Sequence, residues 1–85
     1  MSVIYKYPVD LTDDQQISMP VGAQVLTLQM QDRKPTIWAL VNPDAPKEIR
    51  RFALFGTGHP FDPSGLTYVG TFQTRGLVFH LFEAK

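Results

Sequence analysis

Residues 24–41 read QVLTLQMQ, then DRKP, then TIWALV, and this stretch decides the fold. In its first part apolar and polar side chains alternate, so that Leu26, Leu28 and Met30 share one face. A period of two predicts a β-strand with one buried face. Residues 36–41 are apolar nearly throughout and follow a short polar connection. A strand of mixed polarity joined in this way to an apolar strand predicts an antiparallel hairpin.

Short apolar stretches separated by Pro- and Gly-containing turns extend outward from this hairpin. Pro8 lacks an N–H group, which places the end of the first stretch at a sheet edge or a bend. No segment keeps a helical period, and the gaps are too short for the crossovers that paired parallel strands need. We therefore predict one all-β domain over residues 1–85, a small antiparallel sandwich or partly open barrel of six or seven strands. The remaining predicted strands are residues 3–9, 15–19, 47–55, 66–74 and 77–83, with a short helix as the alternative for residues 47–55.

Composition excludes several function classes. Eight Lys and Arg balance eight Asp and Glu, whereas a general nucleic-acid binder normally carries a clear positive excess. The absence of cysteine excludes disulfides, thiolate catalysis, iron–sulfur clusters and cysteine-based zinc sites. We therefore expect no metal and no cofactor.

The size of the chain bears on its assembly and location. A domain of 85 residues buries a modest share of its surface, and without disulfides self-association is one way to gain stability. A homo-oligomer is therefore expected. No apolar run approaches the roughly 20 residues that span a bilayer, and the first ten residues do not resemble a secretory signal. The expected location is the cytoplasm, without a membrane partner.

The glycine-rich segment GTGHPFDP, residues 56–63, is the first candidate site. Glycines on both sides of Thr57 allow unusual backbone angles, which can turn N–H groups into a concave anion-binding nest. In this interpretation Thr57, Gly58 and His59 bind the ligand. The alternative is an ordinary β-connection that needs glycine and proline only to turn. The lysine and the strand-to-helix setting of a phosphate-binding P-loop are absent.

Three arginines could supply positive charge to a pocket. Arg50 and Arg51 are adjacent on a predicted strand and point to opposite faces, so only one of them can line a given pocket. The guanidinium group binds phosphate or carboxylate in a bidentate manner. The alternative for Arg50 or Arg51 is an ion pair with Asp44 or Glu48. Arg75, in the last turn, is a further candidate.

Aromatic side chains could stack on a nucleobase beside these cations. Trp38 and Tyr68 are the candidates, because stacking together with arginine is a common way to recognise nucleotides. The alternative for Trp38 is the centre of the hydrophobic core.

Two histidines, His59 and His80, support only a weak hydrolase hypothesis. They are not at a metal-ligand spacing, and no serine or threonine lies in a recognisable nucleophile turn. A hydrolase using His59 and His80 requires both imidazoles on the same side of the fold.

Several strings along the chain carry a resemblance to a known family. They include GTGHP at residues 56–60 and YVGTFQ at residues 68–73, with IYKYP, WALVNPDAP and VFHLFE elsewhere. Together they resemble a family of small proteins encoded by tailed bacteriophages and prophages. The resemblance implies a phage accessory protein in the cytoplasm of a bacterial host, and it carries over no catalytic or binding residue.

Three hypotheses for function follow. The first is a non-catalytic protein that captures a small anionic, nucleotide-like ligand, by analogy with phage sponges that sequester a nucleotide immune signal. Thr57, His59, Arg51 and Arg75 would make its polar contacts, with Arg50 in reserve. The second is an inhibitor or adaptor that binds a host or virion protein. The third is the small hydrolase.

Overall fold

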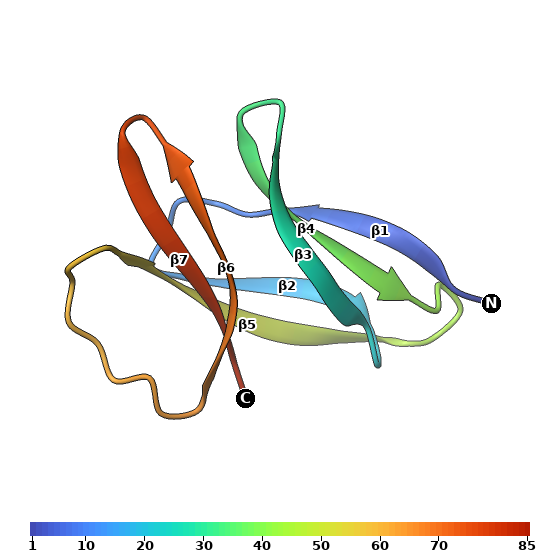
Figure 1. The fold of residues 1–85 in the computed structure, drawn as a ribbon. Coiled ribbons are helices and arrows are strands. Elements are labelled where there is room, and N and C mark those ends of the chain that lie inside the picture. Colours follow the sequence, from blue (N-terminus) through green and yellow to red (C-terminus); the bar gives the residue numbers. More distant parts are fainter.

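The computed structural model describes all residues 1–85 and contains seven strands and no helix (Figure 1). All paired strands are antiparallel, which confirms the predicted all-β class. The chain forms no helix long and apolar enough to cross a membrane. The strands are β1 (Val3–Pro8), β2 (Asp14–Pro20), β3 (Gln24–Gln31), β4 (Lys34–Val41), β5 (Lys47–Gly56), β6 (Leu66–Thr74) and β7 (Leu77–Ala84).

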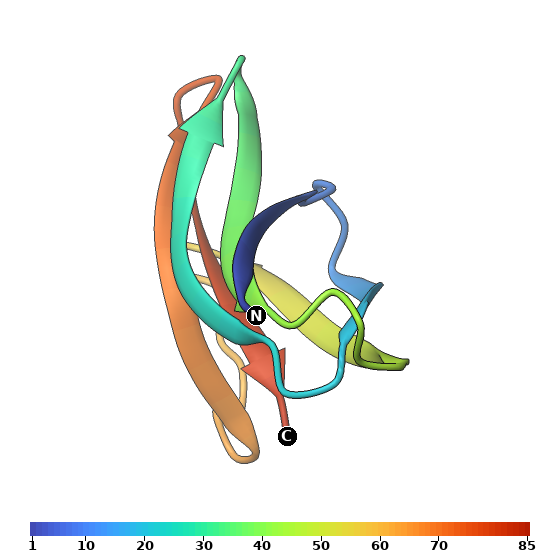
Figure 2. The same ribbon diagram turned by 90° about the vertical axis from the view of Figure 1, so that its right-hand side faces the viewer.

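The strands form two sheets that face each other. One sheet has the order β1-β4-β3, and the other has the order β2-β5-β7-β6. At one side β3 lies along β6, so the two sheets come close together there (Figure 2). At the other side β1 and β2 are not paired. The architecture is therefore a sandwich that resembles an open barrel, as predicted.

The core lies between the two sheets and follows from the alternation of side chains along the strands. Met19, Ile37, Ala39 and Leu81 are fully shielded from solvent. Trp38 alternates with Ile37 and Ala39 and is half-buried on the outer face of the three-stranded sheet. Trp38 is therefore not the core centre. The buried apolar residues are Val9, Met19, Ala23, Leu28, Ile37, Ala39, Val41, Phe52, Leu54, Phe72 and Leu81.

The strand boundaries differ from the predicted ones mainly at the hairpin of β3 and β4. The predicted four-residue connection 32–35 is a turn of only Asp32 and Arg33, and β4 already begins at Lys34. Pro35 belongs to β4, opposite Met30, and its carbonyl accepts a hydrogen bond from the N–H of Val9. Proline is tolerated there because its fixed φ is compatible with an extended chain near the start of a strand.

The long segment between β5 and β6 is a consequence of topology. Both strands pair antiparallel with β7, so they run parallel to each other, and residues 57–65 must return along the sheet. Phe61 in this segment stacks on Phe55 with ring centroids 3.8 Å apart and meets Phe82 edge-on at 5.3 Å. The connection therefore covers part of the outer face of the four-stranded sheet.

The two sheets make their closest approach at Gly70 in β6. A Cβ atom added to Gly70 would lie 2.9 Å from Cβ of Leu28, a buried residue of β3. Both strands carry a β-bulge beside this contact, between Val25 and Thr27 and between Tyr68 and Gly70. Bulges bend a strand locally. The missing side chain lets β3 and β6 pack against each other.

The substitution Gly70→Ala tests this contact. Alanine normally stabilises a strand relative to glycine. Here the methyl group would force β3 and β6 apart, and we expect the free energy of unfolding to fall by about 1–3 kcal/mol. Urea unfolding measures the change, and Gln73→Ala, at an exposed position of β6 that alternates with the buried Phe72, is the control, with an expected change below about 0.5 kcal/mol. An unchanged or higher stability of Gly70→Ala would contradict the account.

Candidate functional site

Two hairpin turns lie at the same end of the molecule (Figures 1 and 2). The β3–β4 turn consists of Asp32 and Arg33, and the β6–β7 turn consists of Arg75 and Gly76. In Figure 2, β3 and β6 run side by side in the same direction, and their turns lie together at the top. The packing of β3 on β6 therefore brings the cationic side chains of both turns to one region.

A cleft of about 620 Å³ lies between these turns. This volume is within the range of about 300–1,000 Å³ that is typical of small-molecule sites. The lining of the cleft combines apolar side chains with polar and charged groups. Its lining residues are Val9, Asp10, Leu11, Met30, Arg33, Lys34, Pro35, Gln73, Thr74 and Arg75.

The charged side chains of this hairpin cleft are mostly cationic. Arg33, Lys34 and Arg75 face a single carboxylate, that of Asp10. Nζ of Lys34 lies 3.3 Å from a carboxylate oxygen of Asp10, and both side chains are more than half exposed. An exposed pair of this kind is weak and leaves the lysine available to a stronger anion. The two guanidinium groups have no carboxylate partner.

Both arginines occupy backbone conformations that disfavour their residue type. Arg33 has φ 66° and Arg75 has φ 53°, in the left-handed region. Two-residue hairpin turns of this kind prefer glycine, asparagine or aspartate at such positions. An L-residue with a larger side chain costs roughly 1–2 kcal/mol there. Each turn therefore places an arginine where the backbone alone would favour another residue.

The strain at Arg33 can be separated from its charge. Arg33→Gly relieves the strain, and we expect the free energy of unfolding to rise by about 0.5–1 kcal/mol. Arg33→Ala removes the same charge but keeps a Cβ atom, so it should leave stability near the parent value. Thermal and urea unfolding of the two variants measure the difference. Equal stability of Arg33→Gly and Arg33→Ala would contradict the assignment of strain.

Two amides of the predicted anion-binding nest, those of Thr57 and His59, are hydrogen-bonded within the chain. The N–H of Thr57 donates to the carbonyl of Val78, and the N–H of His59 donates to the carbonyl of Gly56. Those groups are therefore not free for a ligand. Gly58 has φ +87°, which explains the need for glycine at a turn. At Gly58 the glycine thus serves to turn the chain, as the alternative interpretation expects.

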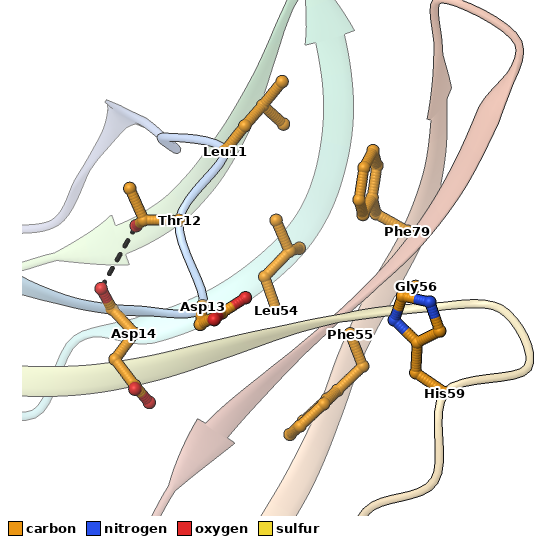
Figure 3. A pocket seen from close by; sticks show the side chains of 9 residues that line it. All are labelled: Leu11, Thr12, Asp13, Asp14, Leu54, Phe55, Gly56, His59 and Phe79. Atoms are coloured by element: carbon orange, nitrogen blue, oxygen red, sulfur yellow. Dashed lines mark hydrogen bonds between the residues drawn. The ribbon is translucent and has the colours of Figure 1, made fainter.

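The side chain of His59 borders a second, smaller cleft of about 360 Å³ (Figure 3). The imidazole lies over Gly56, whose added Cβ would be 3.1 Å from Nδ1 of His59. The carboxylates of Asp13 and Asp14 also line this cleft. Because two carboxylates repel an anion, this cleft is less suited to an anionic ligand than the hairpin cleft.

His80 is the centre of a chain of hydroxyl groups on the outer face of the four-stranded sheet. Its Nε2 lies 2.7 Å from the hydroxyl of Thr57, and its Nδ1 lies 2.9 Å from the hydroxyl of Thr71. The hydroxyl of Tyr68 lies 2.5 Å from that of Thr71. A neutral imidazole donates through one nitrogen and accepts through the other, and hydroxyls satisfy either arrangement. The network fixes His80 and ties Thr57, after β5, to β6 and β7.

The two histidines lie on opposite faces of the four-stranded sheet. His80 pairs across the strands with Phe55, and paired residues share a face. Gly56, the next residue along β5, points to the other face, where His59 covers it. The structure therefore does not bring His59 and His80 together, and the hydrolase hypothesis loses the arrangement that it requires.

Arg50 is held between the sheets in a structural ion pair. Its Nε and Nη2 donate to the carboxylate of Glu83 at 2.6 and 2.8 Å, and Nη1 donates to the carbonyl of Ala23. The hydrogen bond to Glu83 raises the pKa of Arg50 above its usual value, against an opposing effect of desolvation. The partner is Glu83 on β7, the strand next to the one that carries Arg50, whereas the sequence suggested Asp44 or Glu48. Arg50 is therefore unavailable to a ligand in the hairpin cleft.

Removing the charge of Glu83 tests the contribution of this pair. The side chains of Arg50 and Glu83 are only 15% and 21% exposed. Glu83→Gln leaves the guanidinium without a charged partner, and we expect a loss of about 2–3 kcal/mol in the free energy of unfolding. Lys34→Gln, which breaks the exposed pair with Asp10, is the control and should cost less than about 1 kcal/mol. Similar losses in both variants would contradict a special role for the Arg50–Glu83 pair.

The other candidate residues lie away from the hairpin cleft. Arg51 is exposed opposite Gln16 and, as predicted, on the face opposite Arg50. Trp38 is on the outer face of the three-stranded sheet, between Lys6 and Thr27 of the neighbouring strands. Tyr68 is 57% exposed and meets Phe82 edge-on at 5.5 Å. Of the predicted ligand-binding residues, only Arg75 lines the hairpin cleft.

Comparison with known proteins gives a family. A family model described as a domain of unknown function, DUF7352, matches residues 1–85. The chain belongs to the DUF7352 family. Among curated proteins and solved structures, none matches the chain significantly. No group of three or more His, Cys, Asp or Glu side chains is arranged to hold a metal ion.

Sequence reasoning missed Arg33 and Lys34 as candidates for the site. Both lie in the DRKP connection, whose polar residues by themselves predict only a hairpin turn. The available signal was the presence of arginine in two turns that each demand positive φ, DRK at residues 32–34 and TRG at residues 74–76. That signal becomes useful only once β3 and β6 are known to be neighbours.

Proposed function

We propose that this DUF7352 protein binds a small anionic ligand in the hairpin cleft. The observation that carries the proposal is the convergence of Arg33, Lys34 and Arg75 from two different hairpins on one cleft. Phosphate and carboxylate groups are the ligands that guanidinium and ammonium groups recognise best. Binding of this kind needs no acid or base, and the cleft contains no histidine.

The ligand class follows from the lining of the cleft. Cations at both turns fit a ligand with more than one negative charge, such as a diphosphate. Val9, Leu11 and Met30 offer apolar surface to the rest of the molecule, but no aromatic side chain lines the cleft. We therefore propose recognition through phosphate groups, with any nucleobase resting on aliphatic surface. Nucleotides stay within this class, and stacking by Trp38 or Tyr68 is not part of the proposal.

The family resemblance adds a cellular context to the same proposal. A phage-encoded sponge in the bacterial cytoplasm would hold a signalling nucleotide without cleaving it. Such a role requires tight binding and slow release and no catalytic group. Recovery of the intact nucleotide from a denatured complex would support this role, and release of a cleaved product would contradict it.

Calorimetric titration at low ionic strength tests the proposed function. The probes are inorganic pyrophosphate, a cyclic dinucleotide and ADP-ribose. We expect pyrophosphate to bind, and the variants Arg33→Gln and Arg75→Gln each to weaken binding about tenfold, because each removes a charge-assisted contact. Binding should weaken as salt is added, since the groups are exposed to solvent. If the two nucleotides bind with no higher affinity than pyrophosphate, the cleft recognises only the phosphate groups.

The matched control is Lys47→Gln, which removes one exposed positive charge at the start of β5, outside the lining of the cleft. It should leave the affinity unchanged. Absence of binding by all three probes, or an equal effect of Lys47→Gln and Arg33→Gln, would contradict the proposal.

A further inference from the structure

The two sheets have four edge strands, and three of them are protected from pairing with another chain. The edges of β3 and β6 carry bulges and lie against each other. On β2 the exposed residues Asp14, Gln16 and Ser18 are polar, and Pro20 ends the strand. Bulges, polar or charged side chains and proline are the usual means by which proteins block edge pairing.

The fourth edge, β1, also ends at a proline, Pro8, but it has no bulge and fewer polar side chains than β2. Its register with β4 is unbroken from Val3 to Pro8, without a bulge. Ile4 is 59% exposed and Tyr5 is 43% exposed, and Lys6 is the only charged residue of the strand. An exposed, regular and apolar edge is a template for strand pairing.

The direction of the free backbone groups on β1 follows from one hydrogen bond. The N–H of Val9 donates to the carbonyl of Pro35, which continues the β1–β4 register. In an antiparallel ladder, alternate residues direct their N–H and C=O groups to the same neighbour. The N–H and C=O groups of the odd-numbered residues of β1 therefore bond to β4. The N–H and C=O groups of Ile4 and Lys6 point outward. Pro8 also falls in the outward set, where its missing N–H costs the β1–β4 ladder nothing.

We propose that β1 pairs antiparallel with β1 of a second copy of this chain, so that two three-stranded sheets join into one continuous sheet. A two-fold axis at Tyr5, near the strand centre, lets outward-pointing residues pair with each other, and unlike an axis at Lys6 it does not set two lysines opposite each other. Ile4 then exchanges N–H···O bonds with the partner's Lys6, and the symmetry repeats the exchange. Tyr5 faces the partner's Tyr5 as a non-hydrogen-bonded pair on the axis.

Side chains favour a second copy as the occupant of this edge. In the proposed register each Lys6 lies opposite an isoleucine, so the two lysines do not oppose each other. Nζ of Lys6 donates to Oε1 of Gln31 on β3, which directs this side chain across its own sheet and away from the edge. Leu40, 37% exposed, is the cross-strand neighbour of Ile4, and in the joined sheet the two Ile4 side chains would be diagonal neighbours on the outer face, each beside its own Leu40. The pairing is independent of the hairpin cleft, which includes no residue of β1.

Sedimentation velocity across micromolar to millimolar concentration tests the dimer. We expect reversible association in the micromolar range, as for a small interface. Lys6→Pro removes an outward N–H that β4 does not use, and should weaken association at least about tenfold. Ile4→Glu should tighten it by opposing each glutamate to a lysine, and Ile4→Lys should weaken it. Leu40→Glu and Leu40→Lys, one strand further in, are the charge controls and should differ little from each other.

A cross-link tests the register. The chain contains no cysteine, so Tyr5→Cys introduces a single thiol. Facing Cα atoms of a non-hydrogen-bonded pair lie about 4.5 Å apart, within disulfide range. Oxidation should therefore convert Tyr5→Cys to a covalent dimer at least about tenfold faster than Ile4→Cys, whose thiols do not oppose each other.

A monomer at every concentration would overturn the proposal. A dimer whose association is the same in Ile4→Glu, Ile4→Lys and the parent would also overturn it, since the contact would lie elsewhere. Circular dichroism identifies a variant that fails to fold. If Lys6→Pro fails to fold, the comparison of Ile4→Glu with Ile4→Lys and the Tyr5→Cys cross-link still test the proposal.

Discussion

The packing of β3 against β6 at Gly70 is the constraint on which the rest of the structure depends. The two sheets share no ladder, and the contact of Leu28 with the glycine backbone lets β3 and β6 lie side by side. That packing closes one side of the core, leaves the other side open between β1 and β2, and sets both adjacent hairpin turns at the same end. The position of the candidate site is therefore a consequence of how tightly two edge strands pack.

The hairpin turns then connect stability with function. Arg33 and Arg75 occupy left-handed backbone conformations that glycine, asparagine or aspartate would adopt at lower cost. Arg50, in contrast, is neutralised by Glu83 between the sheets and stabilises the fold. The chain thus contains an arginine whose charge is satisfied internally and two at strained turns without a carboxylate partner. The second kind is the one expected at a binding site.

The sequence predicted the fold well because alternation along a strand is a local signal. The strands at residues 24–31 and 66–74 and the edge position implied by Pro8 all follow from local patterns. The site was harder to predict, because it depends on which strands become neighbours. The segment around His59 was an attractive candidate by composition, but its amides at Thr57 and His59 are bonded internally. Arg33 and Lys34 become candidates only because they line the same cleft as Arg75, which lies more than 40 residues away in the chain.

The most direct test of the central claim is the location of a bound anion. Amide chemical shifts, recorded during titration with inorganic pyrophosphate, report this location residue by residue. The account predicts the largest changes at residues 32–34 and 73–76, the turns that β3 and β6 bring together, with little change at residues 56–60. Changes centred on residues 56–60, or no change at either turn, would contradict it.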